Sequence, residues 1–360
     1  MSEASCVHGG NVFAVARQLG VAPAEVLDFS ASINPLGPPP GVAEAVAAAF
    51  ARVVHYPDDG APELRAALAG YHGCRPDEVC VANGSTELIW ALPRAVGGRR
   101  ALVVAPPFGE YAQALVQAGW QVDYLLTTAA EGFTLPLDQL AERLAAGYDL
   151  LLLGNPGNPT GALVPPATVA EVTRLCRQRS TFLALDEAFM DFCEESSAKG
   201  IVLNAERGMI LRSLTKFFAL PGLRLGYALG PTAVIARLAA QVPPWSVGTL
   251  AQAAGLAALA DPAYRERTRQ LIAEERCWLA LQLAELPALQ VYPAAANYLL
   301  VEMTTGLPAA VLRDRLLAER ILIRECSTFV GLDNRFFRVA VRSRADNDRL
   351  VAALQRHLVS

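Results

Sequence analysis

The sequence lacks any uninterrupted apolar stretch of about 18 residues, which is the length that a helix needs to cross a bilayer. Its N-terminus also lacks the basic leader and apolar segment of a secretory signal, so we expect a cytoplasmic protein. Charged residues make up only 18% of the chain, and the formal net charge of −4 comes without any basic run. These absences argue against a membrane protein and against a nucleic-acid-binding protein.

The seven cysteines are scattered, and none of them forms a Cys-x-x-Cys pair. We therefore expect reduced thiols, with neither a disulfide framework nor a metal site. The length of 360 residues allows two or three domains. The high hydrophobic content of 53% suits buried parallel strands and an extensive subunit interface.

Short apolar runs alternate with helical segments over about residues 45–240. The predicted strands are 79–82, 101–105, 121–126, 149–153, 181–185 and 208–212, and predicted helices include 136–146 and 166–178. This alternation predicts an α/β fold with a mixed, mostly parallel sheet between helices. Beyond residue 245 the pattern changes to a long predicted helix at 249–287 and several strands, which indicates a smaller α+β domain.

Lys216 occupies an unusual place, between an apolar run and two phenylalanines. Desolvation there lowers the pKa of an amine and makes it nucleophilic. Ser213, Thr215 and Arg224 are near enough in sequence to hold a phosphate beside it. A phosphorylated aldehyde captured by lysine as an imine is the chemistry of pyridoxal phosphate. A lysine that merely extends from a helix end into water is the alternative, and this stretch alone does not exclude it.

Two further stretches favour the cofactor. Asp186 directly follows an apolar run, where open α/β sheets carry functional side chains. A carboxylate buried there needs a cationic partner, and a protonated pyridine nitrogen is one. Asn158 lies in the rigid Pro- and Gly-rich turn 155–161 after another such run, and its amide can donate to a phenolate oxygen.

Together these motifs resemble those of the fold-type I pyridoxal-phosphate enzymes of the aspartate aminotransferase superfamily. Asn-Pro-Thr-Gly at 158–161, Asp186 and Ser-Leu-Thr-Lys at 213–216 occur in the order found in that superfamily. The resemblance implies the type I PLP-dependent transferase fold, with pyridoxal 5'-phosphate as cofactor and a homodimer as the assembly. It divides the chain into an N-terminal arm that packs on the small domain, a large cofactor-binding domain and a small C-terminal domain, at residues 1–44, 45–245 and 246–360.

The resemblance also implies the other cofactor contacts. Ser85 and Thr86 stand at a predicted helix start that offers backbone amides to a phosphate, although an ordinary N-cap would read the same. Phe108 matches the residue that stacks on the pyridine ring, with Tyr111 as an alternative. Tyr56 matches a tyrosine that reaches the partner's cofactor phosphate. The remaining residues of the predicted cofactor site are Asn158, Asp186, Ser213, Lys216 and Arg224.

By composition the first 40 residues read as a surface arm. However, His8-Gly-Gly-Asn11 and the following Phe-Ser-Ala-Ser-Ile-Asn-Pro-Leu-Gly at 29–37 resemble the opening of L-threonine-O-3-phosphate decarboxylases, a branch close to histidinol-phosphate aminotransferases. The resemblance implies that His8, Gly9 and residue 32 contact the substrate. Residue 32 is serine here, where that branch is expected to carry the longer asparagine.

Arg338 alternates with apolar residues on a predicted strand, and an inward-facing guanidinium there fits a substrate α-carboxylate. The resemblance implies this role for Arg338, binding of the substrate by Asn158, and contact between Arg324 and the substrate phosphate. Structural salt bridges are the alternative for both arginines. Asn297 resembles a further substrate-side position, and Arg342 is a less certain neighbour.

The resemblance implies PLP-dependent decarboxylation of L-threonine O-3-phosphate to (R)-1-amino-2-propanol O-phosphate, a step of cobalamin biosynthesis. Lys216 and Asp186 are then the catalytic residues. The closest alternative is a histidinol-phosphate or related aminotransferase, which would share every cofactor residue. A regulator with a degenerate aminotransferase fold is a second alternative, and the presence of Lys216 and Asp186 weighs against it.

Overall fold

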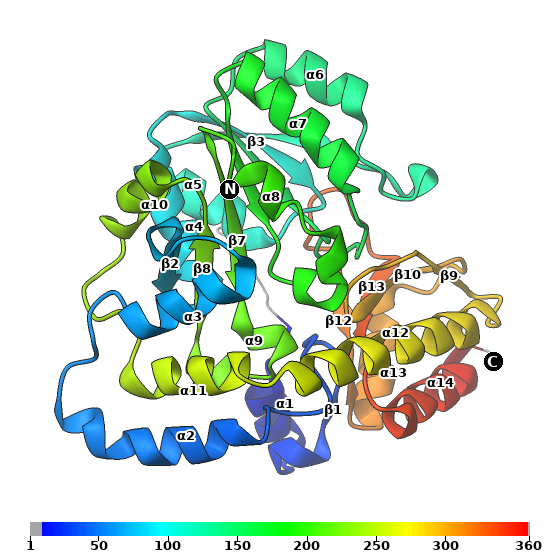
Figure 1. The fold of residues 1–360 in the computed structure, drawn as a ribbon. Helices are drawn as coiled ribbons and strands as arrows, with labels where there is room; N and C mark the ends of the chain where they lie inside the picture. The colour runs from blue at the N-terminus through cyan, green and yellow to red at the C-terminus, as the bar shows by residue number, and fades with distance from the viewer. Residues whose placement is uncertain (1–8, 359–360) are drawn as a thin grey trace.

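The computed structural model describes residues 9–358 and is built around a seven-stranded sheet (Figure 1). The strand order is β2-β8-β7-β6-β5-β3-β4. In chain order the strands are β2 (Val79–Ala82), β3 (Arg100–Ala105), β4 (Gln121–Leu126), β5 (Leu150–Gly154), β6 (Phe182–Asp186), β7 (Gly208–Ser213) and β8 (Gly226–Leu229). β8 runs antiparallel to both of its neighbours, β2 and β7, and all other strand pairs of this sheet are parallel. The predicted mixed, mostly parallel sheet is confirmed.

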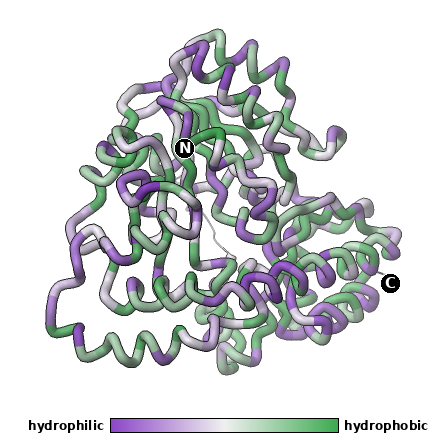
Figure 2. The backbone as a smooth tube through the Cα atoms, viewed as in Figure 1, coloured by the Kyte–Doolittle hydropathy of each residue, from purple (hydrophilic) through white to green (hydrophobic). Residues whose placement is uncertain are grey.

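Helices cover both faces of this sheet, which is why its inner strands are almost continuous runs of Leu, Val and Ile. One face packs against α3 (Pro62–His72), α6 (Leu137–Ala145), α7 (Pro166–Gln178) and α11 (Thr249–Leu259). The other face packs against α4 (Gly84–Val96), α5 (Gly109–Gln117) and α10 (Thr232–Ala239). Figure 2 shows hydrophobic residues gathered along the strands and hydrophilic residues on the outer helices. Within residues 9–358, no helix is both long and apolar enough to span a bilayer.

The C-terminal part forms a second sheet of order β12-β13-β10-β9. Its strands are β9 (Leu289–Val291), β10 (Tyr298–Met303), β12 (Arg324–Glu325) and β13 (Phe336–Ala340), with the helices α12 (Pro262–Ala284), α13 (Ala309–Ala318) and α14 (Arg344–Leu358) packed around them. The N-terminal segment joins this part, because β1 (Leu27–Asp28) pairs with β11 (Ile321–Leu322). That segment also holds α1 (Val12–Leu19), and α2 (Gly41–Ala49) follows it. The domain boundaries at residues 45 and 245 stay a prediction.

The long helix predicted at 249–287 is wrong, because the chain breaks it between Leu259 and Pro262. The residue before a proline is disfavoured in the α-helical region, and Asp261 adopts φ −105° and ψ 88°. Its carboxylate then caps the new helix by accepting from the backbone N–H of Tyr264 at 2.8 Å. The break lets α12 run from the large sheet to the C-terminal part (Figure 1).

Candidate functional site

Lys216 lies just beyond the carboxyl end of β7, in the short helix α9 (Leu214–Phe217). Ser213 starts this helix, because its Oγ accepts from the backbone N–H of Thr215 at 3.3 Å. The two hydroxyls also share a hydrogen bond of 2.7 Å, and Lys216 Nζ donates to Thr215 Oγ1 at 2.9 Å. The amine is thereby held at the wall of a cavity of about 90 Å³ and does not extend into open solvent.

The surroundings of Lys216 favour its neutral form. Burial is the largest effect, and it lowers the pKa of Lys216 to about 8. The positive charges of Arg224 and Arg338 act in the same direction, whereas the negative charge of Asp186 opposes them. The neutral, nucleophilic fraction of the amine near neutral pH is therefore much larger than for an ordinary lysine.

Asp186 ends β6 and faces the same cavity. Burial raises the pKa of its carboxyl group, while two hydrogen bonds and the charge of Lys216 act against that rise. The donors are the Tyr111 hydroxyl, at 2.6 Å from Oδ2, and the Ala188 backbone N–H, at 2.9 Å from Oδ1. Among residues 9–358 no basic side chain forms a salt bridge with Asp186. A cationic ring nitrogen would supply the missing partner.

Tyr111 has a role that the sequence did not reveal. Its hydroxyl is engaged by Asp186, and its ring meets that of Phe108 edge-on, with the centroids 5.8 Å apart and an interplanar angle of 86°. Both rings line the cavity. Tyr111 comes from α5 and Asp186 from β6, so only the tertiary fold brings them together, and no local spacing could have signalled the contact.

An anion-binding corner is the name we give to the part of the cavity wall formed by Ser85, Thr86 and Arg224, which is suited to a phosphate. Ser85 and Thr86 lie in the first turn of α4, where backbone N–H groups lack helical partners and the helix dipole is positive. Close packing forms this corner, because a Cβ on Gly84 would lie 2.7 Å from an Arg224 guanidinium nitrogen. Gly84 also has φ +79°, which glycine adopts readily.

This small cavity therefore joins a carboxylate, an amine and an anion-binding corner. Phe108 adds an aromatic wall, and Asn158 lies at the same cavity. Pyridoxal 5'-phosphate carries a basic ring nitrogen, an aldehyde and a phosphate, so the residues present fit it group by group.

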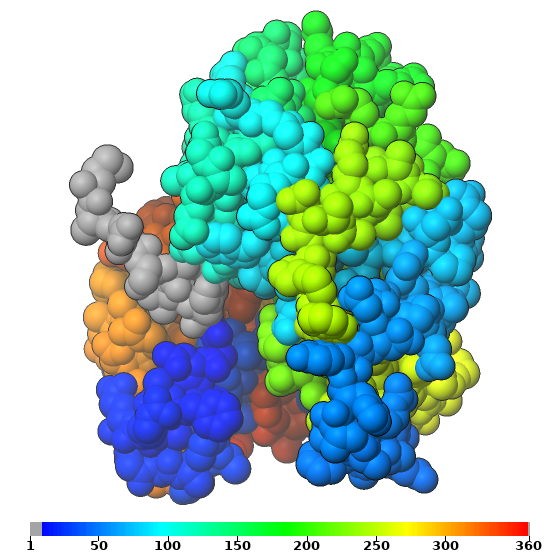
Figure 3. Space-filling view, turned by 90° about the vertical axis from the view of Figure 1, so that its left-hand side faces the viewer, coloured from blue at the N-terminus to red at the C-terminus, as the bar shows by residue number. Residues whose placement is uncertain are grey.

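A larger cleft of about 850 Å³ opens beside the cavity and shares Lys216 and Asn158 with it. Figure 3 shows this face of the molecule hollowed between the dark-blue N-terminal segment and the cyan residues of the large sheet. Predicted substrate residues that line the cleft are Gly9, Ser32, Asn158, Arg324 and Arg338. Gly9 packs so closely that a Cβ would lie 2.3 Å from the Ser30 carbonyl oxygen.

Arg324 and Arg338 are directly opposite each other on β12 and β13, and both are buried. Arg338 donates to the Ser30 carbonyl at 2.8 Å and to Asn158 Oδ1, whereas Arg324 donates to Thr328 Oγ1 at 3.1 Å. Within the described chain, neither guanidinium forms a salt bridge with a carboxylate. The two guanidinium groups therefore give the cleft a positive charge that favours binding of an anion.

Ser32 adds an unused hydrogen-bonding group to the cleft. Its side chain is buried, and its Oγ has no partner among the described residues. A hydroxyl that is buried without a partner costs free energy unless a ligand supplies the missing bond. Ser32 is thus placed to contact a bound anion.

Other predicted residues lie elsewhere. His8 is outside the described residues. Tyr56 is 78% exposed, and its ring stacks on that of Trp245 with the ring centroids 4.6 Å apart. Tyr56 does not line the cleft of its own chain. Asn297 is fully buried and does not line either cavity. Arg342 is engaged structurally, with Asp346 at 3.1 Å, so it is not a free anion-binding group.

Comparison with known proteins supports the predicted superfamily. A family model described as aminotransferase class I and II matches residues 24–354. The chain is 41% identical to the threonine-phosphate decarboxylase of Salmonella typhimurium over 97% of this chain and 95% of that protein. Among solved structures, the histidinol-phosphate aminotransferase from Clostridium acetobutylicum matches with a TM-score of 0.87 and 28% identity, over 93% of this chain and 99% of that chain. The L-threonine-O-3-phosphate decarboxylase from Porphyromonas gingivalis matches with a TM-score of 0.82 and 26% identity, over 93% and 100%.

The covalent attachment point can be tested directly, because the sequence contains only two lysines, Lys199 and Lys216. We expect Lys216→Ala to lose the long-wavelength absorbance band of covalently held pyridoxal phosphate, whereas Lys199→Arg keeps it. After borohydride reduction, peptide mass spectrometry should place the cofactor on Lys216. A labelled Lys199 in the wild-type protein would contradict this assignment.

The lowered pKa of Lys216 gives a pH prediction for the cofactor-free protein. Only the neutral amine attacks an aldehyde, so the rate of cofactor capture should rise with pH and level off above about pH 8. Stopped-flow absorbance after mixing with pyridoxal phosphate measures this rate. A rate that keeps rising through pH 10, where an ordinary lysine titrates, would show that the amine is not perturbed.

Proposed function

This chain belongs to the class I and II aminotransferase family, and from that premise we propose that it decarboxylates L-threonine O-3-phosphate with pyridoxal 5'-phosphate as cofactor. The product is (R)-1-amino-2-propanol O-phosphate, and the pathway is cobalamin biosynthesis. The observation that carries the proposal is the pair of buried arginines without carboxylate partners, Arg324 and Arg338, beside Lys216. The proposed substrate carries a carboxylate and a phosphate on one molecule, one anion for each arginine. Histidinol phosphate carries a phosphate alone, and in an aminotransferase the carboxylates would come from the 2-oxo acid.

Different residues of the cofactor site would hold the ring nitrogen, the ring and the phosphate of the cofactor. When bound, pyridoxal phosphate withdraws electrons from the substrate Cα, so that carbon dioxide can leave. Asp186 keeps the ring nitrogen protonated, and Tyr111 steadies the carboxylate that does so. Phe108 stacks on the ring. The first turn of α4 joins Arg224 and Ser213 in holding the phosphate.

Lys216 would hold the cofactor covalently through its amine, which would become free again once substrate occupies the site. Its free amine then lies in the cleft, where it can return a proton to Cα after carbon dioxide has left. The lowered pKa of Lys216 suits this exchange of protons near neutral pH.

The substrate is oriented by its two anionic ends. Arg338 forks onto the α-carboxylate, while Arg324, Ser32 and the His8-Gly9 segment hold the phosphate. These residues would hold the Cα substituents in a fixed orientation relative to the cofactor, and that orientation would decide which Cα bond is weakened. Anchoring at two points would therefore set which Cα bond is broken.

The working unit in this proposal is a homodimer. Large apolar side chains gather next to the Tyr56–Trp245 stack, and Phe50, Val54, Tyr56 and Trp245 are all at least half exposed. Such a patch indicates a protein interface. Tyr56 would then reach the cofactor phosphate of the partner subunit. The cytoplasmic location stays a prediction.

Product analysis separates the proposed activity from its closest alternative. Incubation with L-threonine O-3-phosphate should release carbon dioxide and aminopropanol phosphate without any added 2-oxo acid. In Arg338→Lys the charge remains but the fork is lost, so we expect kcat/KM to fall by roughly 10-fold or more. Turnover of histidinol phosphate that depends on 2-oxoglutarate, with no carbon dioxide release, would instead establish an aminotransferase.

Mixing two inactive variants tests whether Tyr56 acts across the dimer. Tyr56→Ala and Lys216→Ala should each have little activity alone. A mixed dimer contains one site with Lys216 from one subunit and Tyr56 from the other, so unfolding and refolding them together should restore activity. If Tyr56 acted within its own chain, no mixed site would be complete and activity would stay absent.

A further inference from the structure

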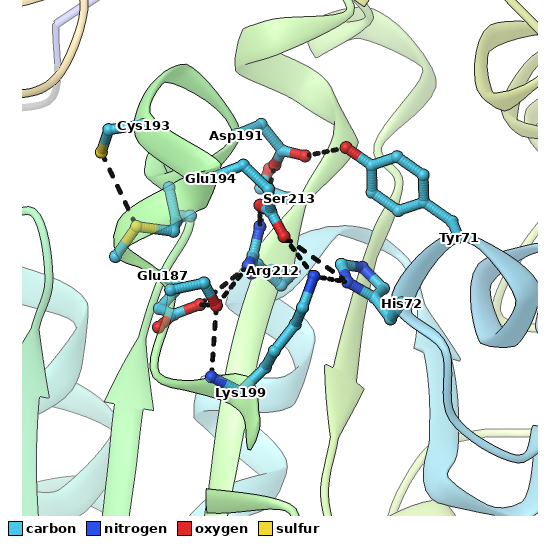
Figure 4. Close-up of polar contacts among 12 residues, drawn as sticks. Tyr71, His72, Glu187, Asp191, Cys193, Glu194, Lys199, Arg212 and Ser213 are labelled. Carbon is cyan, nitrogen blue, oxygen red and sulfur yellow. Dashed lines mark hydrogen bonds and ion pairs between the residues drawn. The ribbon is translucent and has the colours of Figure 1, made fainter. Parts of the chain in front are cut away.

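A cluster of buried charges lies behind the cofactor site, on the opposite face of the sheet (Figure 4). Arg212 is its centre and is fully buried. Its guanidinium contacts Glu187 at 2.9 Å, Glu194 at 2.7 Å and Asp191 at 3.4 Å. Lys199 completes the cluster through Glu194 at 2.5 Å. Neither Arg212 nor Glu187 lines the cofactor cavity or the substrate cleft.

The cluster is connected to the site through the alternation of strand residues. Successive side chains of a strand point to opposite faces of the sheet. Asp186, the last residue of β6, faces the cofactor cavity, and Glu187, which directly follows the strand, faces the cluster. On β7, Arg212 faces the cluster, and the next residue, Ser213, faces the cofactor. Each residue of the ion pair is therefore the direct chain neighbour of a predicted cofactor residue: Glu187 follows Asp186, and Arg212 precedes Ser213.

The ion pair closes the end of the β6–β7 ladder. The last register pair is Asp186 with Leu211, and the Glu187 N–H donates to the Leu211 carbonyl at 2.8 Å. Beyond that point the Glu187–Arg212 pair holds the two strand ends together. The Ser197 hydroxyl bridges the pair, because it donates to Glu187 Oε2 at 2.7 Å and accepts from Arg212 Nη2 at 2.9 Å.

Stability alone explains this arrangement poorly. Buried ion pairs pay a large desolvation cost, and apolar replacements often match them in stability. The same face is apolar one step earlier, at Leu185 and Ile210. The charged pair has a geometric effect that apolar residues lack. The planar guanidinium group of Arg212 fixes both the distance to the Glu187 carboxylate and the orientation of that carboxylate.

We propose that Arg212 and Glu187 are positioning residues that set the spacing between Asp186 and the Ser213–Lys216 segment. Cofactor affinity then depends on an ion pair that the cofactor never touches. This inference rests on the cofactor and not on the proposed substrate, so it holds whichever reaction the enzyme performs.

Two conservative variants test the pair. Arg212→Lys keeps the charge but loses the fork, and Glu187→Gln keeps the shape but loses the charge. Residues that orient metal ligands typically contribute 10- to 100-fold to metal affinity, and we expect an effect at the lower end of that range here, with pyridoxal phosphate dissociating from either holoenzyme about 10-fold faster. Dilution into excess apo-acceptor protein, followed by absorbance, measures the dissociation rate.

A spectroscopic readout separates positioning from a general loss of stability. If Asp186 shifts, the ring holds less positive charge, and the nearby proton on the Lys216 nitrogen is held more tightly. The pH at which the absorbance of the bound cofactor changes should therefore rise in both variants. Leu279→Ala is the matched control, because Leu279 is fully buried in the C-terminal core and its loss lowers Tm without touching β6 or β7.

The proposal is overturned if the variants lose Tm like Leu279→Ala but retain wild-type cofactor dissociation and absorbance midpoint. Should either variant fail to fold, Ser197→Ala provides the test, because it removes only the bridging hydroxyl and keeps both charges. We expect a smaller acceleration of cofactor dissociation and a smaller rise of the midpoint. Values identical to wild type in Ser197→Ala would then overturn the proposal.

Discussion

Two neighbouring parallel strands end side by side, and the site depends on the fixed distance between those ends. β6 supplies Asp186, and β7 leads through Ser213 to Lys216. The carboxyl ends of parallel strands lie at one edge of a sheet, where side chains can face a ligand without breaking the ladder. A rigid, buried ladder therefore presents a carboxylate and an amine to opposite ends of one small molecule.

The electrostatics of the site follow from burial at that edge. Desolvation moves the pKa of Lys216 down and that of Asp186 up, so burial alone would discharge both groups. Tyr111 and the Ala188 N–H favour the charged carboxylate, whereas Arg224 and Arg338 favour the neutral amine. The Lys216 amine is therefore easier to deprotonate than an ordinary lysine, and the hydrogen bonds to Asp186 partly offset the effect of burial on its carboxylate.

The sequence predicted the parts of this arrangement that are encoded locally. Apolar runs located the strands, and the residues that follow them located Asp186, Asn158 and Lys216. It failed where three-dimensional packing decides, since α5 brings Tyr111 to Asp186 across 75 positions of sequence. The helix break at Pro262 was a local signal that the apolar periodicity of 249–287 obscured. The contact between Arg212 and Glu187 could not be predicted from the sequence, because it depends on how β6 and β7 are aligned in the sheet.

Reaction choice in this family has to be sought in the substrate cleft and not in the fold. Structures named as an aminotransferase and as a decarboxylase match this chain with TM-scores of 0.87 and 0.82, so overall shape does not distinguish the two reactions. What differs is how the Cα substituents are held. Arg324 and Arg338 are a register pair on neighbouring strands, so both guanidinium groups start from the same face of the small sheet and line the same cleft. In the proposed reaction, these two arginines would hold the anionic ends of the substrate, and the orientation that they impose would decide which Cα bond is broken.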